Sequence, residues 1–275
     1  RKYTKVAIGG DGGDELFGGY PTFKILKYNR FLNGKVQAAL LRLIVKFLAV
    51  NYERYSLRYK ARRFLRGTGQ PPGKAFQHWL FTMDDFTLNS LLPGESDNLL
   101  MVVDSIVNGI EGADEVWQMS QQYLRLFLPG VLMKVDTASM YYGLEVRAPF
   151  LQPAVARMAL ELPSGMKVNN GQTKYILRKL LCEMGLERQA RLPKQGFNVP
   201  LGQWIRGRLK TYVKSIIDRD KLVATEFFNP QVVLHLLEEH QNGAEDHFDA
   251  LWSILVTQNF LDRKSTRLNS SHESP

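Results

Sequence analysis

The residues best suited to chemistry lie in a run of glycines and carboxylates at positions 9–20, GGDGGDELFGGY. Four glycines precede Glu15, so the backbone there can adopt positive φ angles and leave its N–H groups uncovered. Asp11, Asp14 and Glu15 lie within five residues, and their mutual repulsion calls for a cation. The run therefore suits a magnesium-bound phosphate or a substrate ammonium group. A solvated acidic turn is the simpler interpretation, but it does not explain the glycines on both sides of Leu16-Phe17.

A second concentration of charge occupies residues 131–151, a largely apolar segment. It carries Lys134, Asp136, Glu145 and Arg147. Because buried charges need partners, we expect these four side chains to form a network. For Glu145 and Arg147, a purely structural ion pair is an equally good interpretation.

A third candidate is Lys194, in the segment RLPKQGFNVPL at 191–201. Two prolines and a glycine predict a rigid loop, which would hold the lysine in place. A fixed ammonium group suits a phosphate contact.

The elements that must position these residues are one strand and many helices. The segment before the acidic run, residues 3–8, is β-branched and predicts a buried strand. Residues 67–73 and 128–130 predict breaks, and Asn170-Gly171 predicts a hairpin turn. Apolar periodicity predicts helices over 23–33, 34–50, 52–65, 76–83, 86–92, 99–109, 115–127, 153–162, 173–184, 204–218, 230–240 and 248–261.

Composition narrows the class of protein. The 275 residues are 44% hydrophobic and 23% charged, which is typical of one large or two small globular domains. The net charge of +9 suits anionic ligands such as nucleotides, and also nucleic acid. Cys182 is the only cysteine, which excludes an internal disulfide and favours a reducing compartment; its helical context predicts a core thiol. With no apolar run of membrane length, we expect a cytoplasmic protein without a membrane anchor.

The two ends of the chain differ in character from its middle. The chain begins at Arg1, directly before a strand, and we expect an upstream part to be missing. Residues 263–275 contain one leucine and no other apolar side chain, which predicts a disordered, non-native tail. The predicted domain therefore covers residues 1–262.

Three blocks of the sequence, in this order, resemble the synthetase domain of glutamine-hydrolysing asparagine synthetases. They are the acidic run at 9–20, the segment 134–151, and the segment 171–201. The resemblance covers about residues 3–262, nearly the whole chain. It implies an α/β ATP-pyrophosphatase fold, in which helices surround a parallel sheet. Within that fold, this fragment is expected to be mainly α-helical with one N-terminal strand.

The resemblance also implies the chemistry. MgATP would activate the side-chain carboxylate of aspartate as β-aspartyl-AMP and release pyrophosphate. Ammonia, supplied by glutamine hydrolysis in an N-terminal glutaminase domain, would then attack to give asparagine. ATP and Mg²⁺ are the implied cofactors, and a homodimer is compatible with the resemblance.

The same resemblance assigns roles to individual positions. Asp11 matches an acidic residue that faces the substrate and adenylate. Asp14 matches a carboxylate that serves magnesium-pyrophosphate or the substrate amino group, and it is the one expected metal ligand. Lys194 matches a lysine that stabilises charge on the phosphates. The expected cofactor-binding positions are Gly10, Gly12, Glu15 and Tyr20. The expected supporting positions are Asp136, Glu145 and Arg147.

The chain also departs from the family pattern. The family's pyrophosphate loop, Ser-Gly-Gly-x-Asp-Ser, and the glutaminase domain would lie upstream of Arg1, so we expect this fragment alone to be inactive. Position 9 is Gly where the family usually has Ser. Pro129-Gly130 replaces a more acidic pair.

The sequence also allows two other interpretations of its function. β-Lactam synthetases and lasso-peptide cyclases also adenylate a carboxylate, and the three blocks do not separate them from asparagine synthetases. A basic helical nucleic-acid-binding module is favoured by the pI of 9.5 and by the basic, aromatic segment 52–65. The acidic run argues against that module, because it would repel phosphates unless it held metal, and we expect no nucleic-acid partner.

Overall fold

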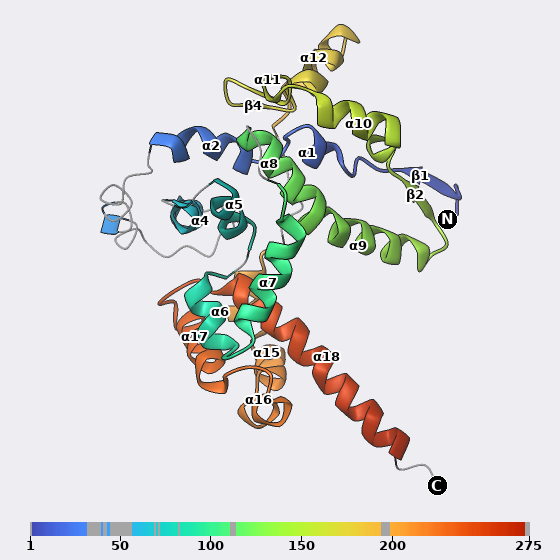
Figure 1. The fold of residues 1–275 in the computed structure, drawn as a ribbon. Helices are drawn as coiled ribbons and strands as arrows, with labels where there is room; N and C mark the ends of the chain where they lie inside the picture. The colour runs from blue at the N-terminus through green and yellow to red at the C-terminus, as the bar shows by residue number, and fades with distance from the viewer. Residues whose placement is uncertain are drawn as a thin grey trace. The chain divides into compact units, whose positions relative to one another are not determined.

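The computed structural model describes residues 2–31, 40, 43–44, 57–68, 70, 72–81, 83–110, 114–193 and 199–272. These residues are mainly helical (Figure 1). The chain forms two compact units that are interleaved in sequence. Unit 1 comprises Arg1–Lys35, Thr68–Gln77 and Met101–Gly196. Unit 2 comprises Val36–Gly67, His78–Leu100 and Phe197–Pro275.

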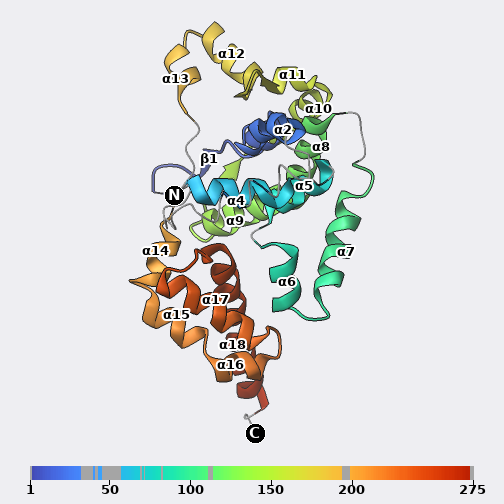
Figure 2. The same ribbon diagram turned by 90° about the vertical axis from the view of Figure 1, so that its left-hand side faces the viewer.

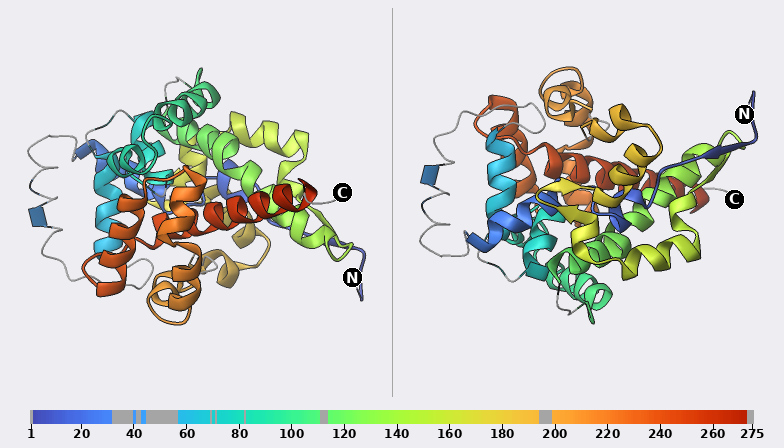
Figure 3. Two further views of the ribbon diagram at one scale, coloured as in Figure 1. Left: turned by 90° about the horizontal axis from the view of Figure 1, so that it is seen from below. Right: turned by 90° about the horizontal axis from the view of Figure 1, so that it is seen from above.

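Unit 1 contains a short parallel sheet. Strand β1 (Val6–Ile8) pairs with β2 (Glu145–Arg147), with Ala7 opposite Val146. The two strands lie side by side near the N-terminus (Figures 1 and 3). The sequence predicted one strand, whereas the described residues contain four short ones. The additional strands have two or three residues each, too few for a period-2 pattern to distinguish them from loops.

The predicted burial of the first strand is wrong. Ile8 is 79% exposed and Val6 is 39% exposed. Parallel sheets are usually covered by helices on both faces, and their strands then read as continuous apolar runs. The apolar residues of β1 match that pattern, but in the described chain no second layer covers these two side chains.

A small core lies beneath the acidic run. Helix α1 (Gly13–Leu16) and the start of α2 (Thr22–Phe31) follow β1, and α10 (Pro153–Glu161) contacts α1. Leu16, Phe17 and Ala159 are buried together in this core. Phe17 meets the edge of Phe150, with ring centroids 5.6 Å apart. The apolar pair inside the acidic run thus anchors the loop to the protein interior.

The predicted break at 128–130 does not occur. Helix α8 (Glu115–Gln122) continues as a π-helical turn, η1 (Tyr123–Phe127), and directly as α9 (Leu128–Met140). Pro129 falls in the first turn of α9. A proline is tolerated there because the missing N–H has no obligatory partner, and the wider π turn before it relieves the clash that proline makes in a regular helix.

The predicted hairpin turn is confirmed. Strand β3 (Val168–Asn169) pairs antiparallel with β4 (Gln172–Thr173). Asn170 and Gly171 join them with φ angles of 48° and 79°. Positive φ at both central positions defines the tight turn that Asn-Gly favours. The chain enters this hairpin from α11 (Ser164–Lys167) and leaves it through Lys174 into α12 (Tyr175–Glu183).

Helix α12 is less buried than expected. Cys182, predicted to be a core thiol, is exposed. The apolar residues of this helix form a stripe that is only partly covered, by α11 and by α13 (Glu187–Arg191). Periodicity locates the apolar stripe of a helix but does not tell which layer packs against it.

Unit 2 is a helical cluster, with most of its C-terminal helices visible in Figure 2. Its core combines Ile205, Val213, Leu222, Val233 and Leu251, all fully buried. The helices that contribute to the unit are α4 (Leu57–Gly67), α6 (Asp85–Leu91), α14 (Leu201–Arg206), α15 (Lys210–Ile216), α16 (Arg219–Thr225), α17 (Pro230–Asn242) and α18 (Phe248–His272). Two further helices, α5 (Pro72–Leu80) and α7 (Ser96–Val107), include residues of both units.

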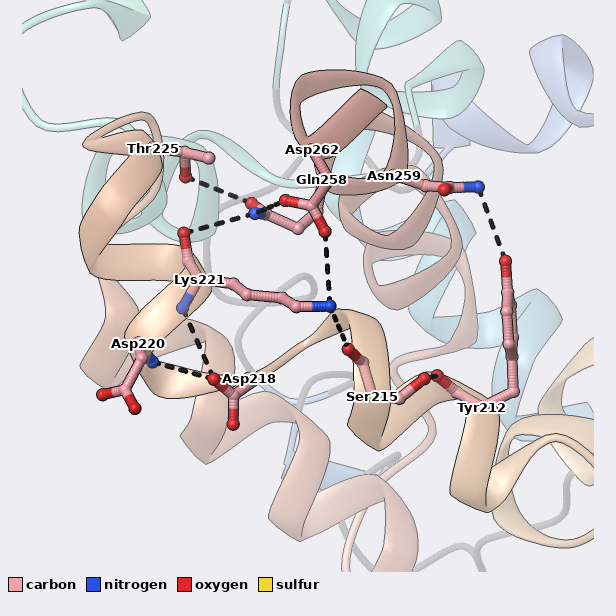
Figure 4. A network of polar contacts seen from close by, with 9 residues as sticks. All are labelled: Tyr212, Ser215, Asp218, Asp220, Lys221, Thr225, Gln258, Asn259 and Asp262. Atoms are coloured by element: carbon pink, nitrogen blue, oxygen red, sulfur yellow. Dashed lines mark hydrogen bonds and ion pairs between the residues drawn. The ribbon is translucent and has the colours of Figure 1, made fainter. Parts of the chain in front are cut away.

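A polar network joins three helices of unit 2 (Figure 4). The amide of buried Gln258 on α18 donates to the carbonyl of Lys221 on α16, at 3.3 Å, and to Asp262 Oδ1, at 2.8 Å. The Lys221 ammonium donates to the carbonyl of Ser215 on α15, at 2.7 Å. Buried polar groups need such partners, so this network fixes how α15, α16 and α18 meet.

The predicted helix 34–50 and the beginning of 52–65 lie largely outside the described residues. Helix α18 continues to His272, into the segment predicted to be disordered. That the segment is foreign to the domain stays a prediction. In the described chain, no helix combines the length and the apolar character needed to cross a bilayer.

Candidate active site

The acidic run forms the loop between β1 and α1, at the carboxyl end of a parallel strand. Gly9 N donates to Arg147 O at 2.8 Å, which ties the start of the loop to β2. Gly12 has a φ of 85°, and a Cβ on it would overlap the Leu151 side chain. Gly12 is therefore required by the fold. Its predicted contact with a nucleotide stays a prediction.

Gly10 is the open point of the loop. It is exposed, and a Cβ built on it would meet no described atom within 4 Å. Nothing in the packing therefore demands glycine at this position. An uncovered backbone at the end of a parallel strand is where a phosphate group can approach closely.

Glu15 is turned inward and is only 2% exposed. The hydroxyl of Tyr20 donates to Glu15 Oε1 at 2.5 Å. Burial, together with the hydrogen bond to Glu15 and its charge, raises the pKa of Tyr20 far above its ordinary value, so the phenol keeps its proton. Tyr20 also stacks on Tyr123 of the π-helical turn, with ring centroids 4.3 Å apart. The structure thus gives both Glu15 and Tyr20 a supporting role inside the loop, and the contacts with a cofactor stay predicted.

Asp14 is paired with a lysine from a distant part of the sequence. Lys174 Nζ lies 2.9 Å from Asp14 Oδ1, and the two side chains are 31% and 18% exposed. Gly19 packs against both, since a Cβ on it would overlap Asp14 Oδ1 and Lys174 Cε. Lys174 falls within the helix predicted at 173–184, and the sequence assigned it no role in a site. The signal that could have singled it out is its position directly after the β3–β4 hairpin, within one of the three blocks of the resemblance.

Asp11 is half-buried and forms no hydrogen bond or ion pair with the described residues. A Cβ on Gly9 would lie 2.8 Å from Asp11 Oδ2 and 3.2 Å from Val146 Cγ1. The glycine that departs from the family pattern at position 9 thus leaves room for the Asp11 carboxylate above the strand end.

The expected supporting residues do not form the predicted network. Arg147 Nε lies 2.8 Å from Glu145 Oε1, but these side chains are 68% and 53% exposed. Lys134 and Asp136 are exposed on α9, and within the described chain they pair with neither of them. The premise of burial was wrong, since α9 and β2 are uncovered on the side that carries these charges. Lys194 lies outside the described residues.

Among the described residues, no three His, Cys, Asp or Glu side chains are grouped as a metal site. Mg²⁺ does not need such a group, because it is usually held by one or two carboxylates together with substrate phosphates and water. Asp11 and Asp14 have the oxygen donors that this arrangement uses. The donor set therefore fits a metal that arrives with its nucleotide.

Comparison with known proteins agrees with the resemblance found in the sequence. A family model described as "Asparagine synthase" matches residues 1–262. A putative glutamine-hydrolysing asparagine synthetase of Mycobacterium tuberculosis H37Rv is 29% identical, with 93% of this chain and 39% of that protein covered. The glutamine-hydrolysing asparagine synthetase 1 of Bacillus subtilis 168 is 26% identical, with 93% and 40% covered. The chain thus spans about two fifths of the length of these relatives. No solved structure matches.

Proposed function

The chain belongs to the asparagine synthase family, and we propose that its acidic loop serves the ATP-dependent conversion of aspartate to asparagine within a longer protein. One observation carries this proposal. The loop lies at the carboxyl end of a parallel strand, with an open backbone at Gly10 and the carboxylates of Asp11 and Asp14 beside it. In open α/β sheets, ligands bind outside the carboxyl ends of the strands.

The proposed reaction has two steps. A carboxylate is a poor electrophile, so an oxygen of the aspartate side chain first attacks the α-phosphorus of ATP. The bond from that phosphorus to the bridging oxygen breaks, and pyrophosphate leaves. The nitrogen of ammonia then attacks the acyl carbon of β-aspartyl-AMP, and AMP leaves as asparagine forms. The protein must hold pyrophosphate, orient the carboxylate and exclude water.

In this scheme, the residues of the chain have distinct tasks. Asp11 faces the substrate, and Asp14 serves the substrate ammonium group or magnesium. Mg²⁺, when bound with the nucleotide, neutralises charge on the phosphates. Lys194 adds a fixed positive charge to the leaving pyrophosphate. Glutamine, hydrolysed in another domain of the longer protein, supplies the ammonia.

The nucleic-acid alternative loses its main support. Helix α4 carries the basic residues that favoured it, but several are engaged inside unit 2. Arg63 Nε donates to the carbonyl of Trp79 at 2.7 Å, and Arg62 pairs with Glu245. Burial lowers the pKa of Arg66. These side chains build the unit and do not form a free basic face.

The test is ATP–pyrophosphate exchange by the full-length protein. Aspartate should start the incorporation of labelled pyrophosphate into ATP, whereas peptide substrates with a free side-chain carboxylate should not. Exchange that depends on a peptide would instead favour a lasso-peptide cyclase type of enzyme. Exchange with neither class of substrate would contradict carboxylate adenylation.

A further inference from the structure

Arg178 on α12 links two segments of unit 1 that α12 separates along the chain. Its Nε donates to the carbonyl of Thr173 at 2.9 Å, at the end of the β3–β4 hairpin. Its Nη1 donates to the carbonyl of Ala190 and, at 3.3 Å, to that of Leu192, both at the end of α13. One half-buried guanidinium group thus satisfies three carbonyl oxygens.

These contacts depend on the shape of the arginine head group. A guanidinium group carries five N–H donors in a rigid plane, so it can donate on two sides at once. A lysine has a single nitrogen and no second one with which to reach the opposite side. The last carbonyls of a helix lack partners within the helix, which explains the bonds to Ala190 and Leu192. It does not explain the bond to Thr173, which ties that helix end to the hairpin.

The hairpin end of this link is itself fixed to the acidic loop. Thr173 is buried and directly precedes Lys174, whose ammonium group pairs with Asp14 at 2.9 Å. Gly18 also packs against the hairpin, since a Cβ on it would lie 2.8 Å from Val168 Cγ2. The Thr173 carbonyl is therefore a reference point that stays with the acidic loop.

The other end of the link leads to Lys194. Leu192 is followed by Pro193, whose ring fixes its φ angle, and then by Lys194. Because peptide bonds are planar, only the ψ angle of Pro193 can turn between the held carbonyl of Leu192 and the Cα atom of Lys194. Leu192 has a φ of −58° and a ψ of 134°, the extended backbone that a following proline favours. The backbone that carries the proposed pyrophosphate contact thus starts from a fixed point.

We propose that Arg178 is a positioning residue that acts through Lys194. It ties the backbone before Lys194 to the hairpin, and so sets the distance between that lysine and the carboxylates of the acidic loop. This inference rests on the proposed function, in which Lys194 adds positive charge to the leaving pyrophosphate. Arg178 itself touches neither the substrate nor the nucleotide, and its effect reaches the reaction only through the position of Lys194.

A double-mutant cycle in the full-length protein tests whether Arg178 acts through Lys194. Arg178→Lys keeps the positive charge and loses the planar group, Lys194→Met removes the cation, and a third variant carries both changes. Arg188→Lys, at an exposed position of α13, is the matched control. Melting temperatures check that each variant folds, and aspartate-dependent ATP–pyrophosphate exchange gives kcat and the KM for aspartate.

With Lys194 present, Arg178→Lys should lower kcat about 10- to 100-fold, a loss of the size that a displacement of about 1 Å can cause. The KM for aspartate should stay unchanged, because Lys194 acts on the phosphates and not on the amino acid. In the Lys194→Met background the same change should have no further effect, and Arg188→Lys should match wild type. An equal fall in both backgrounds, or no fall in either, would show that Arg178 only supports the fold and would overturn the proposal.

Pro193→Gly covers the case in which Arg178→Lys does not fold. It leaves the three hydrogen bonds of Arg178 in place and frees the φ angle between the held carbonyl and Lys194. Since Pro193 is exposed, the melting temperature should stay close to that of wild type. Exchange should fall severalfold with Lys194 present and should not fall further in Lys194→Met. Unchanged exchange in a stable Pro193→Gly variant would overturn the proposal.

Binding of pyrophosphate separates this proposal from the proposed reaction. Inorganic pyrophosphate with magnesium chloride is titrated calorimetrically into the same variants, without aspartate or ATP. Arg178→Lys and Lys194→Met should each weaken the binding, and the double variant should bind no more weakly than Lys194→Met. This pattern in a protein that lacks exchange would contradict the proposed reaction and leave the role of Arg178 standing. Binding that Arg178→Lys leaves unchanged, or a wild-type protein that binds no pyrophosphate, would overturn that role.

Discussion

The three carboxylates of the acidic loop have three different surroundings. Glu15 is buried against the Tyr20 hydroxyl, and Asp14 is paired with Lys174. Asp11 forms no such contact with the described residues. The repulsion that the sequence predicts is thus largely compensated from within the protein. Asp11 is left as the carboxylate best placed to meet a ligand.

Replacing Tyr20 with Phe tests the compensation of Glu15. The buried carboxylate would lose its phenolic donor, and the free energy of unfolding at pH 7 should fall by about 1.5–3 kcal/mol, the range for a hydrogen bond to a charged group. Urea unfolding measures this difference. Tyr141→Phe is the control, because Tyr141 is 82% exposed and should tolerate the change.

The same variant has a predicted pH dependence. The pKa of Tyr20 is raised above its ordinary value of 10.0, so the folded state keeps a proton that the unfolded state loses above that pH. This contribution to stability is complete below pH 10.0 and is lost as the pH rises further. Tyr20→Phe should therefore decline in stability less steeply than wild type above pH 10. Parallel declines would show that Tyr20 ionises freely.

Lys167 is a buried cation with the opposite sign of pH dependence. It is fully buried, and within the described chain its Nζ has no hydrogen-bond partner. Burial lowers the pKa of Lys167, an effect that the charge of Asp114 partly opposes. Between the lowered pKa and 10.5 the unfolded state holds more protons, so this group makes stability rise with pH.

Lys167→Met should remove that rise and stabilise the protein at pH 7. Replacing a buried ionic group with an apolar side chain of similar volume is often neutral or gives about 1–4 kcal/mol. Chemical denaturation at pH 7 and pH 10 measures both effects, with Lys179→Met as the exposed control. A loss of stability at both pH values would show that the ammonium group has a partner the protein needs.

At the scale of elements, local signals in the sequence were reliable where the backbone conformation of a few neighbouring residues determines the structure. Asn170-Gly171 predicted its turn because positive φ is required at both positions. Asp84 stands just before the helix predicted at 86–92, where an aspartate side chain favours a helix start; it accepts a hydrogen bond from Thr87 N at 2.8 Å and caps α6. The pairing of Lys174 with Asp14 could not be predicted, because the two residues are far apart in sequence and only the tertiary fold brings them together.

The glycines of the acidic loop offer a matched pair of variants. Gly12→Ala would place a Cβ into Leu151 at a φ of 85°, so it should lower the free energy of unfolding by about 1–3 kcal/mol. Gly10→Ala meets no described atom within 4 Å and should leave stability unchanged. If a nucleotide approaches the backbone at Gly10, the same alanine should weaken ATP binding by the full-length protein.

Thermal unfolding and nucleotide titration distinguish these effects. Weakened ATP binding by Gly10→Ala at wild-type stability would support a ligand at the open point of the loop. Unchanged ATP binding would place the nucleotide elsewhere. A stable Gly12→Ala would show that Leu151 can move aside.

At the scale of the whole molecule, the sequence predicted the family correctly but was less reliable about which residues are buried. The first strand and Cys182 were both expected inside the protein, and both are exposed. An apolar stretch indicates that its side chains tend to be covered, but it does not identify the part of the protein or the partner that covers them. The division into two interleaved units was also not predicted, because each unit is assembled from three separate stretches of the chain.

The central claim is that the acidic loop is where a carboxylate is adenylated, and Asp11→Asn tests it most directly. Aspartate-dependent ATP–pyrophosphate exchange should be measured in the full-length protein and in this variant, with melting temperatures as a check on folding. We predict that the variant folds normally and loses exchange by about 100-fold or more, as expected when a group that acts on the transition state is removed. Undiminished exchange in Asp11→Asn would contradict the account.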